Sequence, residues 1–237
     1  MVTKKLLFIF ILLSPVSTMN PWSITLDKKV FQQSIIDRFE TIKTANSTEL
    51  PTLPLIQKAL TGYEILLKEQ SLKRPEVITI IDFGLSSDKK RLWVLDLFKA
   101  KVLYHCLVAH GRNSGGLTAE YFSNNPNSYA SSPGFYTTGA TYFGKNGLSL
   151  VLDGLERGIN DKARERAIVI HGADYVSADF IKKNGRLGRS FGCPAVPEEL
   201  SKEIIQTIKG GSCLFINTPK ASYAANSTII NEMVSSN

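Results

Sequence analysis

The sequence predicts a mainly β fold, a sandwich or barrel, with a helical pair before it and one helix near its end. From residue 77 onward, short apolar runs are separated by Gly, Ser and Asn, which is typical of short strands. Before them, apolar residues recur at helical spacing, and a third helical pattern follows Pro197. The 237 residues, 43% hydrophobic and 21% charged, have the composition of a folded protein with one large domain.

The first segment, 1–19, has the layout of a secretory signal peptide. Lys4 and Lys5 precede an apolar run at 6–13, which is followed by Pro15 and small residues. This apolar run is too short to span a bilayer, so we expect cleavage and no stable membrane insertion of the mature chain. We therefore expect an exported protein, periplasmic or extracellular and associated with the cell wall.

Two amphipathic stretches form an N-terminal helical segment at 20–75. Their apolar residues recur at helical spacing: Phe31, Ile35, Phe39 and Ile42 in the first, and Ile56, Ala59, Leu60, Tyr63 and Leu67 in the second. We expect both helices to be structural caps on the domain that follows, in preference to a separate binding module.

The predicted catalytic domain spans 76–218 and is followed by a C-terminal tail at 219–237. Its strands are expected at 77–83, 91–97, 101–109, 134–143, 148–152, 167–172 and 213–217. Pro197 opens a helix that suits Glu198 and Glu199 in its first turn and ends before Gly210. The long polar loops 110–133 and 173–192 are of a length that is usually functional.

Charge and cysteine content narrow the function. The formal net charge is +7, but the basic residues are scattered and form no stripe interleaved with aromatics, so we expect no nucleic-acid partner. A polyanionic neighbourhood or a plain solvated basic surface both fit. Three cysteines cannot all pair; Cys106 and Cys213 lie in apolar runs and leave a disulfide open, whereas Cys193 lies in the polar loop GRSFGC.

A cysteine in such a loop is a candidate nucleophile. Thiol chemistry needs a thiolate, a base and donors for the negative charge on the attacked carbonyl. A thiol of pKa about 8.5 is only about 3% ionised at pH 7, so a neighbouring imidazole can raise the reactive fraction up to about thirtyfold. His171 follows the apolar run AIVI at a strand end and is the leading base; His110 is similarly placed, and His105 lies within a strand.

Ordered blocks of this sequence resemble the catalytic domain of the L,D-transpeptidases. The family's signature, a histidine followed by a Ser-x-Gly-Cys element, is matched by HGADYVSADFIKKNGRLGRSFGCPAV. Other blocks resemble the murein L,D-transpeptidase branch with a GRSxGCPAV ending: IIDFGLSSDKKRLWVLDL, LVAHG, SSPGFYTTG, GLSLVLDGLERG and GSCLFI. The resemblance covers about residues 76–217 and implies the YkuD-type fold.

The resemblance implies a cysteine transferase of cell-wall biogenesis that acts on peptidoglycan stem peptides. In that family the cysteine attacks the carbonyl between the L-centre of meso-diaminopimelate and the following D-alanine, and D-alanine is released. The acyl-enzyme then passes to an amine, which gives a 3→3 cross-link. Water as acceptor gives an L,D-carboxypeptidase, and carbapenems are expected to acylate the same thiol.

Carried onto this chain, the resemblance makes Cys193 the nucleophile and His171 its base. It implies that the main-chain carbonyl of Gly172 orients the imidazole, with Asp174 as the side-chain competitor. It also implies an oxyanion site formed by the backbone N–H groups of Gly192 and Cys193.

The loop departs from the commonest family pattern, which has a second histidine before the Gly-Cys pair. Here that position is Phe191, which forms no hydrogen bonds through its side chain. Arg189 and Arg186 are the leading substitutes for binding the carboxylates of the donor, against the alternative of surface ion pairs. Ser190 is expected to tie down the loop beside the substrate. Tyr136 and Tyr142 are lower-ranked candidates for lining the peptide groove.

Other classes fit less well. A catalytically silent peptidoglycan-binding protein is the main alternative, because the second histidine is missing. A papain-like protease needs a cysteine near the mature N-terminus, which this sequence lacks. The spacing of His171, Cys193 and Asp174 does not suit zinc, so no metal and no cofactor are expected, and the sequence sets no oligomeric state.

Overall fold

The computed structural model describes residues 21–231, in two compact units that divide between Ser34 and Ile35. The signal peptide expected at 1–19 lies outside the described residues. Helix α1 (Pro21–Ala45) contributes to both units, and within the larger one its residues Ile35, Phe39 and Ile42 are buried. Across 21–231, no helix combines the length and apolar character that crossing a membrane requires.

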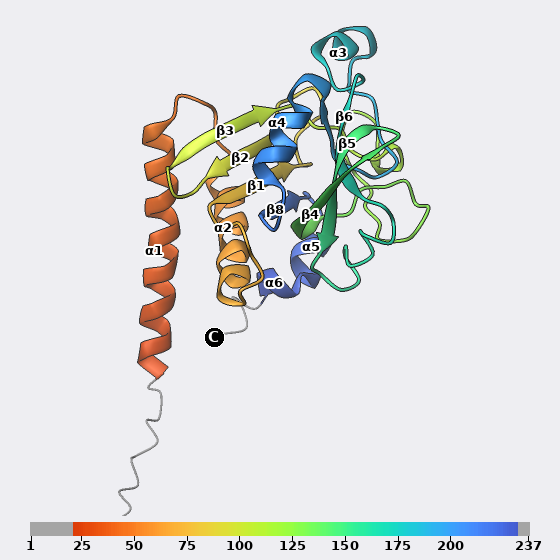
Figure 1. The fold of residues 1–237 in the computed structure, drawn as a ribbon. Coiled ribbons are helices and arrows are strands. Elements are labelled where there is room, and N and C mark those ends of the chain that lie inside the picture. The colour runs from red at the N-terminus through yellow and green to blue at the C-terminus, as the bar shows by residue number, and fades with distance from the viewer. Residues whose placement is uncertain (1–20, 232–237) are drawn as a thin grey trace, which may run out of the picture. The chain divides into compact units, whose positions relative to one another are not determined.

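The larger unit is built on one mixed sheet of eight strands, in the order β3-β2-β1-β8-β4-β5-β6-β7 (Figure 1). The strands are β1 (Val77–Asp82), β2 (Leu92–Asp96), β3 (Lys101–Cys106), β4 (Gly134–Gly144), β5 (Gly147–Gly154), β6 (Val169–Ala173), β7 (Ala195–Pro197) and β8 (Cys213–Asn217). The pairs β1–β8 and β6–β7 are parallel, and the other pairs are antiparallel. The mainly β fold with helices is confirmed.

Two helices cover opposite faces of this sheet: α2 (Leu53–Lys68) and α4 (Glu198–Ile208). Successive residues of a strand point to opposite faces. In β1, Ile81 joins the core cluster that contains the α4 residues Ile204 and Ile208. On the other face, Phe135 of β4 lies directly against Gly62 of α2, where a Cβ atom would come within 2.1 Å of its ring. Both predicted helices are therefore present and pack through their apolar stripes.

The sheet closes on itself through the segment that follows β3. Ala109 pairs with Ala195 of β7, with N–H to O distances of 2.8 and 3.3 Å, and Gly111 bridges Ser190. The predicted strand 101–109 is therefore wrong at its end, because residues 107–109 leave β2 and join the opposite edge. This closure places the GRSFGC loop against the loop that begins at His110.

Four short elements escaped the sequence patterns. Strand β7 has three residues, and α3 (Ala178–Asn184) buries no side chain, so neither has a readable period. The short helices α5 (Ala221–Asn226) and α6 (Thr228–Asn231) occupy the segment expected to be a tail. Tyr223 of α5 is buried. The domain boundaries at 76 and 218 stay predictions.

Candidate active site

Cys193 lies at the end of the GRSFGC loop, immediately before β7. Gly192 has a φ of +123°, a conformation that side chains other than glycine rarely adopt. A Cβ atom there would lie 2.9 Å from the Ala130 carbonyl oxygen and 3.1 Å from Ile168 Cδ1. Glycine is thus required both by the turn and by the close approach of loop 123–132. Cys193 itself is partly exposed, whereas Cys106 and Cys213 are buried free thiols and do not form a disulfide.

The Cys193 thiol contacts the backbone of the segment that leads into β6. The Val169 N–H points at Sγ at 3.4 Å, and the Ala167 carbonyl oxygen lies 3.7 Å from Sγ. Burial raises the pKa of the thiol, while the Val169 N–H and the positive charge of Arg166 lower it. Burial, the largest of these effects, thus favours the neutral form of the resting thiol.

His171 lies in β6 and is held in one tautomer. Its Nδ1 is 2.8 Å from the Gly172 carbonyl oxygen. A carbonyl oxygen can only accept a hydrogen bond, so Nδ1 carries the proton and Nε2 is left as the unprotonated acceptor. The side chain is buried, and burial lowers the pKa of the imidazole despite that hydrogen bond. A neutral imidazole with an unprotonated Nε2 has the form that a general base needs.

The strand register relates the thiol to the imidazole. In the parallel pair β6–β7, His171 lies opposite Ala195, and the same register carried back two residues sets Val169 opposite Cys193. Val169 and His171 share one face of β6, about 7 Å apart along the strand. The Cys193 side chain itself packs against the core cluster that contains Ile170, whose side chain points to the opposite face of β6 from His171. The register thus brings the two segments together, and the thiol bonds to the backbone of the segment that leads into β6.

The two expected oxyanion donors differ in availability. The Gly192 N–H donates to Ser190 Oγ at 3.1 Å, and the Ser190 hydroxyl donates in turn to the Cys193 carbonyl at 2.6 Å. Ser190 thus ties the loop to itself. Within residues 21–231, the Cys193 N–H donates to no oxygen, so it is the donor that stays open to a substrate. The Gly192 N–H becomes available only if Ser190 releases it.

Ser131, which the sequence did not single out, fixes the direction of that open donor. Its hydroxyl donates to the Gly192 carbonyl at 3.1 Å and accepts from the Gly111 N–H at 3.0 Å. In a trans peptide the C=O and N–H bonds point in opposite directions. Holding the Gly192 carbonyl on Ser131 therefore turns the Cys193 N–H away from loop 123–132.

Arg166 holds loop 123–132 in place through hydrogen bonds. Its two terminal nitrogens donate four hydrogen bonds, to the Ser123 and Ala130 carbonyls at 2.7 and 2.6 Å and to the Ser128 and Ser132 hydroxyls, both at 3.2 Å. The guanidinium lies 3.3 Å from the position of a Cβ on Gly192. No sequence pattern marked Arg166, although loop 110–133 was recognised by its length.

The predicted carboxylate-binding arginines are engaged elsewhere. Arg189 donates to the backbone carbonyls of Arg112 and Gly115, and Arg186 donates to the carbonyl of Leu187. Neither arginine takes part in an ion pair among the described residues, so the alternative of surface ion pairs also finds no support.

The two tyrosines have different environments. Tyr136 is wholly buried and bonds through its hydroxyl to the Ser132 carbonyl, so its assignment to the peptide groove is wrong. Tyr142 is 44% exposed and lies opposite Ser149, which in turn lies opposite His171. Directly opposite residues share a face of the sheet, so Tyr142 lies on the same face as His171 and two strands, about 10 Å, away from it.

The other histidines, and the side chain proposed as a competitor for orienting the imidazole, have partners elsewhere. His110 is buried, and its Nδ1 accepts from Arg91 at 2.9 Å. His105 stacks on Trp93 with ring centroids 4.8 Å apart. Asp174 is exposed and accepts a bond from Ser177 through its backbone carbonyl, whereas the Gly172 carbonyl faces the imidazole.

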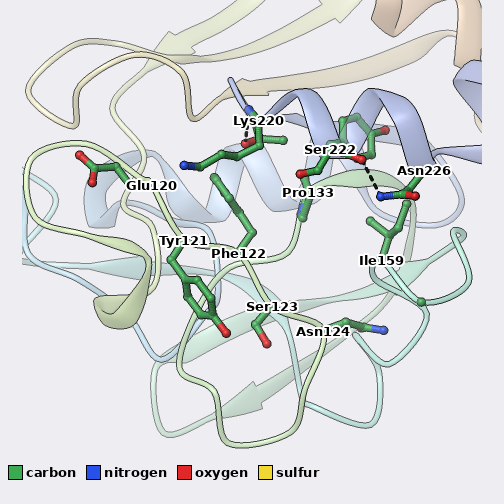
Figure 2. Close-up of a pocket in the computed structure, with 13 residues that line it drawn as sticks. Glu120, Tyr121, Phe122, Ser123, Asn124, Pro133, Ile159, Lys220, Ser222 and Asn226 are labelled. Atoms are coloured by element: carbon green, nitrogen blue, oxygen red, sulfur yellow. Dashed lines mark hydrogen bonds between the residues drawn. The ribbon is translucent and has the colours of Figure 1, made fainter.

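A separate pocket of about 480 Å³ is lined on one side by loop residues 120–124 (Figure 2). It is bordered by α5 and by Pro133 and Ile159, and neither Cys193 nor His171 lines it. Within residues 21–231, no three His, Cys, Asp or Glu side chains are grouped to hold a metal ion.

Solved L,D-transpeptidases are similar to this chain at low sequence identity. An L,D-transpeptidase from Mycobacterium smegmatis is 12% identical, with 60% of this chain and 59% of that chain covered and a TM-score of 0.38. L,D-transpeptidase 3 from Mycobacterium tuberculosis with a faropenem-derived adduct is 10% identical, with 60% of each chain covered and a TM-score of 0.39. The enzyme from Stackebrandtia nassauensis is 13% identical, with 70% and 68% covered and a TM-score of 0.37.

The family assignment comes from the sequence match over the domain. This chain spans 59% of the length of the Mycobacterium smegmatis protein, and no curated protein matches it. The L,D-transpeptidase catalytic domain matches residues 48–217, which is more than half of the chain and includes α2, the whole sheet, His171 and Cys193. The chain therefore belongs to the L,D-transpeptidase catalytic domain family.

Proposed function

We propose that this protein is an exported cysteine acyltransferase that carries out L,D-transpeptidation on peptidoglycan stem peptides. The observation that carries the proposal is the pairing of β6 with β7, which brings the segment of a partly exposed Cys193 beside the strand of a tautomer-fixed His171. Membership of the transpeptidase family supports the substrate class. The signal-like segment at 1–19 supports export to the periplasm or cell surface.

In the first half-reaction, Cys193 Sγ attacks the carbonyl carbon between the L-centre of diaminopimelate and D-alanine. The thiol proton passes to His171 Nε2 as the sulfur–carbon bond forms, because both groups are neutral at rest. The Cys193 N–H donates to the oxyanion of the tetrahedral intermediate. The carbon–nitrogen bond then breaks, the imidazole returns the proton to the leaving amine, and D-alanine departs from a thioester.

In the second half-reaction, an amine of another stem peptide attacks the thioester carbon. His171 accepts the amine proton and returns it to the departing sulfur, which restores the thiol and leaves a new amide. Water in place of the amine gives a carboxylic acid, so an L,D-carboxypeptidase is the alternative outcome of the same acyl-enzyme.

The test is acylation of the mature protein. We expect a carbapenem to add one intact mass to the protein, and a disaccharide tetrapeptide to yield free D-alanine. Cys193→Ala loses both signals, while Cys106→Ala keeps both because that thiol is buried. His171→Ala is expected to slow acylation much more at pH 7 than above pH 9, where a growing fraction of the thiol ionises without a base.

A folded protein that forms no adduct and releases no D-alanine would instead be a catalytically silent peptidoglycan-binding protein. Sedimentation with purified sacculi separates that case from a loss of all wall affinity. Equal slowing of His171→Ala at both pH values would remove the imidazole from the role of base.

A further inference from the structure

An arginine packed against two neighbouring aromatic rings adjoins the Cys193 loop. The Arg112 guanidinium carbon lies 4.4 Å from the centroid of the Tyr129 ring and 4.8 Å from that of Phe191. The two rings are 5.0 Å apart and tilted by 51°. Phe191 is 65% exposed, which is unusual for a large apolar side chain two residues from a candidate nucleophile.

The backbone fixes this cluster to the Cys193 loop. The Arg112 N–H donates to the Ser190 carbonyl at 2.8 Å. One residue earlier, a Cβ on Gly111 would lie 2.9 Å from Gly192 Cα, so the two segments are in contact at these glycines. Arg112 and Phe191 therefore project from two adjoining segments, one of which continues directly into Cys193.

The arginines of this region differ in what their donors do. Arg166 uses both terminal nitrogens on loop 123–132, and Arg189 and Arg186 donate to backbone carbonyls. The Arg112 guanidinium, by contrast, has no hydrogen-bond acceptor and no carboxylate partner within residues 21–231. Its contacts are with the faces of the two rings.

The two rings contact each other and lie on one side of the guanidinium, so its N–H groups that point away from the rings stay free. Contact with both rings restricts the side chain, which lowers the entropy cost of binding a ligand to those N–H groups. These N–H groups match a carboxylate, which accepts two parallel hydrogen bonds from them. Phe191 thus has a use at the position where the commonest family pattern has a histidine.

We propose that Arg112, packed against Tyr129 and Phe191, binds a free carboxylate of the acyl donor while Cys193 attacks its neighbouring carbonyl. This inference rests on the proposed function for the identity of the donor. A stem tetrapeptide offers two such carboxylates, one on the D-centre of diaminopimelate and one on the terminal D-alanine. Arg112 replaces Arg189 and Arg186 in this role.

The experiment measures how well a stem tetrapeptide protects Cys193 from iodoacetamide. The probes are the free tetrapeptide and two analogues, each amidated at one of the two carboxylates. We expect Arg112→Gln to weaken protection by the free peptide about tenfold, the loss of a hydrogen-bonded charge pair. The analogue that lacks the bound carboxylate should protect the wild type and Arg112→Gln equally, which identifies the carboxylate.

Two further sets of variants test the charge of Arg112 and its contact with the two rings. Arg157→Gln removes the same charge from an exposed position and should leave protection unchanged. Phe191→Leu and Tyr129→Leu should each weaken protection about threefold by releasing the guanidinium, and Arg112→Lys should restore only part of it. Unchanged alkylation rates without peptide show that each variant keeps the loop folded.

The inference is overturned if Arg112→Gln protects like the wild type, if both amidated analogues lose protection in the wild type and in Arg112→Gln by the same factor, or if no peptide protects the wild type. Because protection needs no turnover, its outcome is independent of D-alanine release. A wild type that is protected through Arg112 but forms no adduct sinks the proposed function alone.

Discussion

At the scale of single residues, burial and charge set the resting state of the candidate nucleophile and base. Burial raises the pKa of Cys193 and lowers that of His171, so both favour their neutral forms. The Gly172 carbonyl then selects the tautomer that leaves Nε2 free. In the proposed reaction the proton transfer is therefore coupled to the attack on the substrate, without a preformed ion pair.

His110, at the start of loop 110–133, makes the stability of the fold depend on pH. Its Nδ1 accepts from the buried Arg91, and burial together with that charge lowers its pKa to about 4. In the unfolded chain its pKa is about 6.5. Between these values the unfolded state binds a proton that the folded state does not. The stabilisation is therefore fully present above pH 6.5 and is lost as the pH falls towards 4.

We therefore expect the free energy of unfolding to drop by up to about 3 kcal/mol between pH 7 and pH 4, an order-of-magnitude figure from 1.36 kcal/mol per pKa unit. His110→Gln should flatten most of this drop, because its amide oxygen accepts from Arg91 without titrating. His105→Gln is the comparison variant: burial also lowers the pKa of this half-exposed histidine, but the drop caused by His110 should persist. Urea denaturation at both pH values measures the effect, and equal slopes for His110→Gln and wild type would contradict it.

At the scale of elements, the loop that follows β3 and the loop that precedes β7 form one unit around Cys193. Residues 107–109 continue from β3 onto β7, and Gly111 touches Gly192. Loop 123–132 is then fastened over both by Arg166 and Ser131. The position of the Cys193 N–H is thus set by segments more than 60 residues apart, since Ser131 and Gly192 are separated by 61 positions.

Arg166→Met removes four hydrogen bonds from this loop and one positive charge from beside the thiol. We expect the pKa of Cys193 to rise, because Arg166 is one of the groups that lower it. Each unit of rise reduces the thiolate fraction at pH 7 about tenfold. The measurement is the pH profile of iodoacetamide alkylation.

Two variants control this prediction. Arg164→Met lies on the same segment but is largely exposed and pairs with Asp153, so its profile should match that of the wild type. Arg166→Lys keeps the charge but loses the fork, so we expect a smaller shift of the pKa with a lower melting temperature. A profile for Arg166→Met that coincides with the wild type would show that Arg166 does not act on the thiol.

At the scale of the whole described molecule, the C-terminal helices complete the buried polar network around Glu156. This carboxylate accepts from the Phe135 N–H at 2.8 Å, from the Tyr223 hydroxyl at 3.0 Å and from the Ser227 hydroxyl. Burial raises the pKa of Glu156 despite these donors. Two of the donors come from residues 221–231, a segment that looked like a tail in the sequence.

A chain that ends at residue 218 should therefore melt at a lower temperature, because the buried carboxylate loses Tyr223 and Ser227. Ser227→Ala alone should cost about 1–3 kcal/mol of unfolding free energy, the penalty of a lost buried partner. Ser222→Ala, which removes an exposed hydroxyl from α5, is the matched control. Thermal unfolding followed by circular dichroism measures the effect. An unchanged melting temperature for the shortened chain would show that residues 219–237 do not stabilise the fold.

Local patterns were sufficient for the long, strongly periodic elements and for the chemical identity of the candidate pair. The stripe of Leu200, Ile204 and Ile208 predicts α4, and the apolar runs predict seven of the eight strands, because burial of one face imposes a period on the sequence. The block between His171 and Cys193 predicts the candidate site, since its chemistry lies within 23 consecutive residues.

Only the tertiary structure decided which groups surround that pair. Strand β7, the closure through Ala109, and the positions of Arg112, Ser131 and Arg166 all depend on pairing between distant segments, which leaves no period in any one of them. The arginines nearest to Cys193 in sequence turned out to bond to backbone, and one from 81 positions earlier stands free beside it. The sequence by itself determined the candidate pair, whereas folding determined the partners of that pair, because hydrogen bonds form between groups that are close in space.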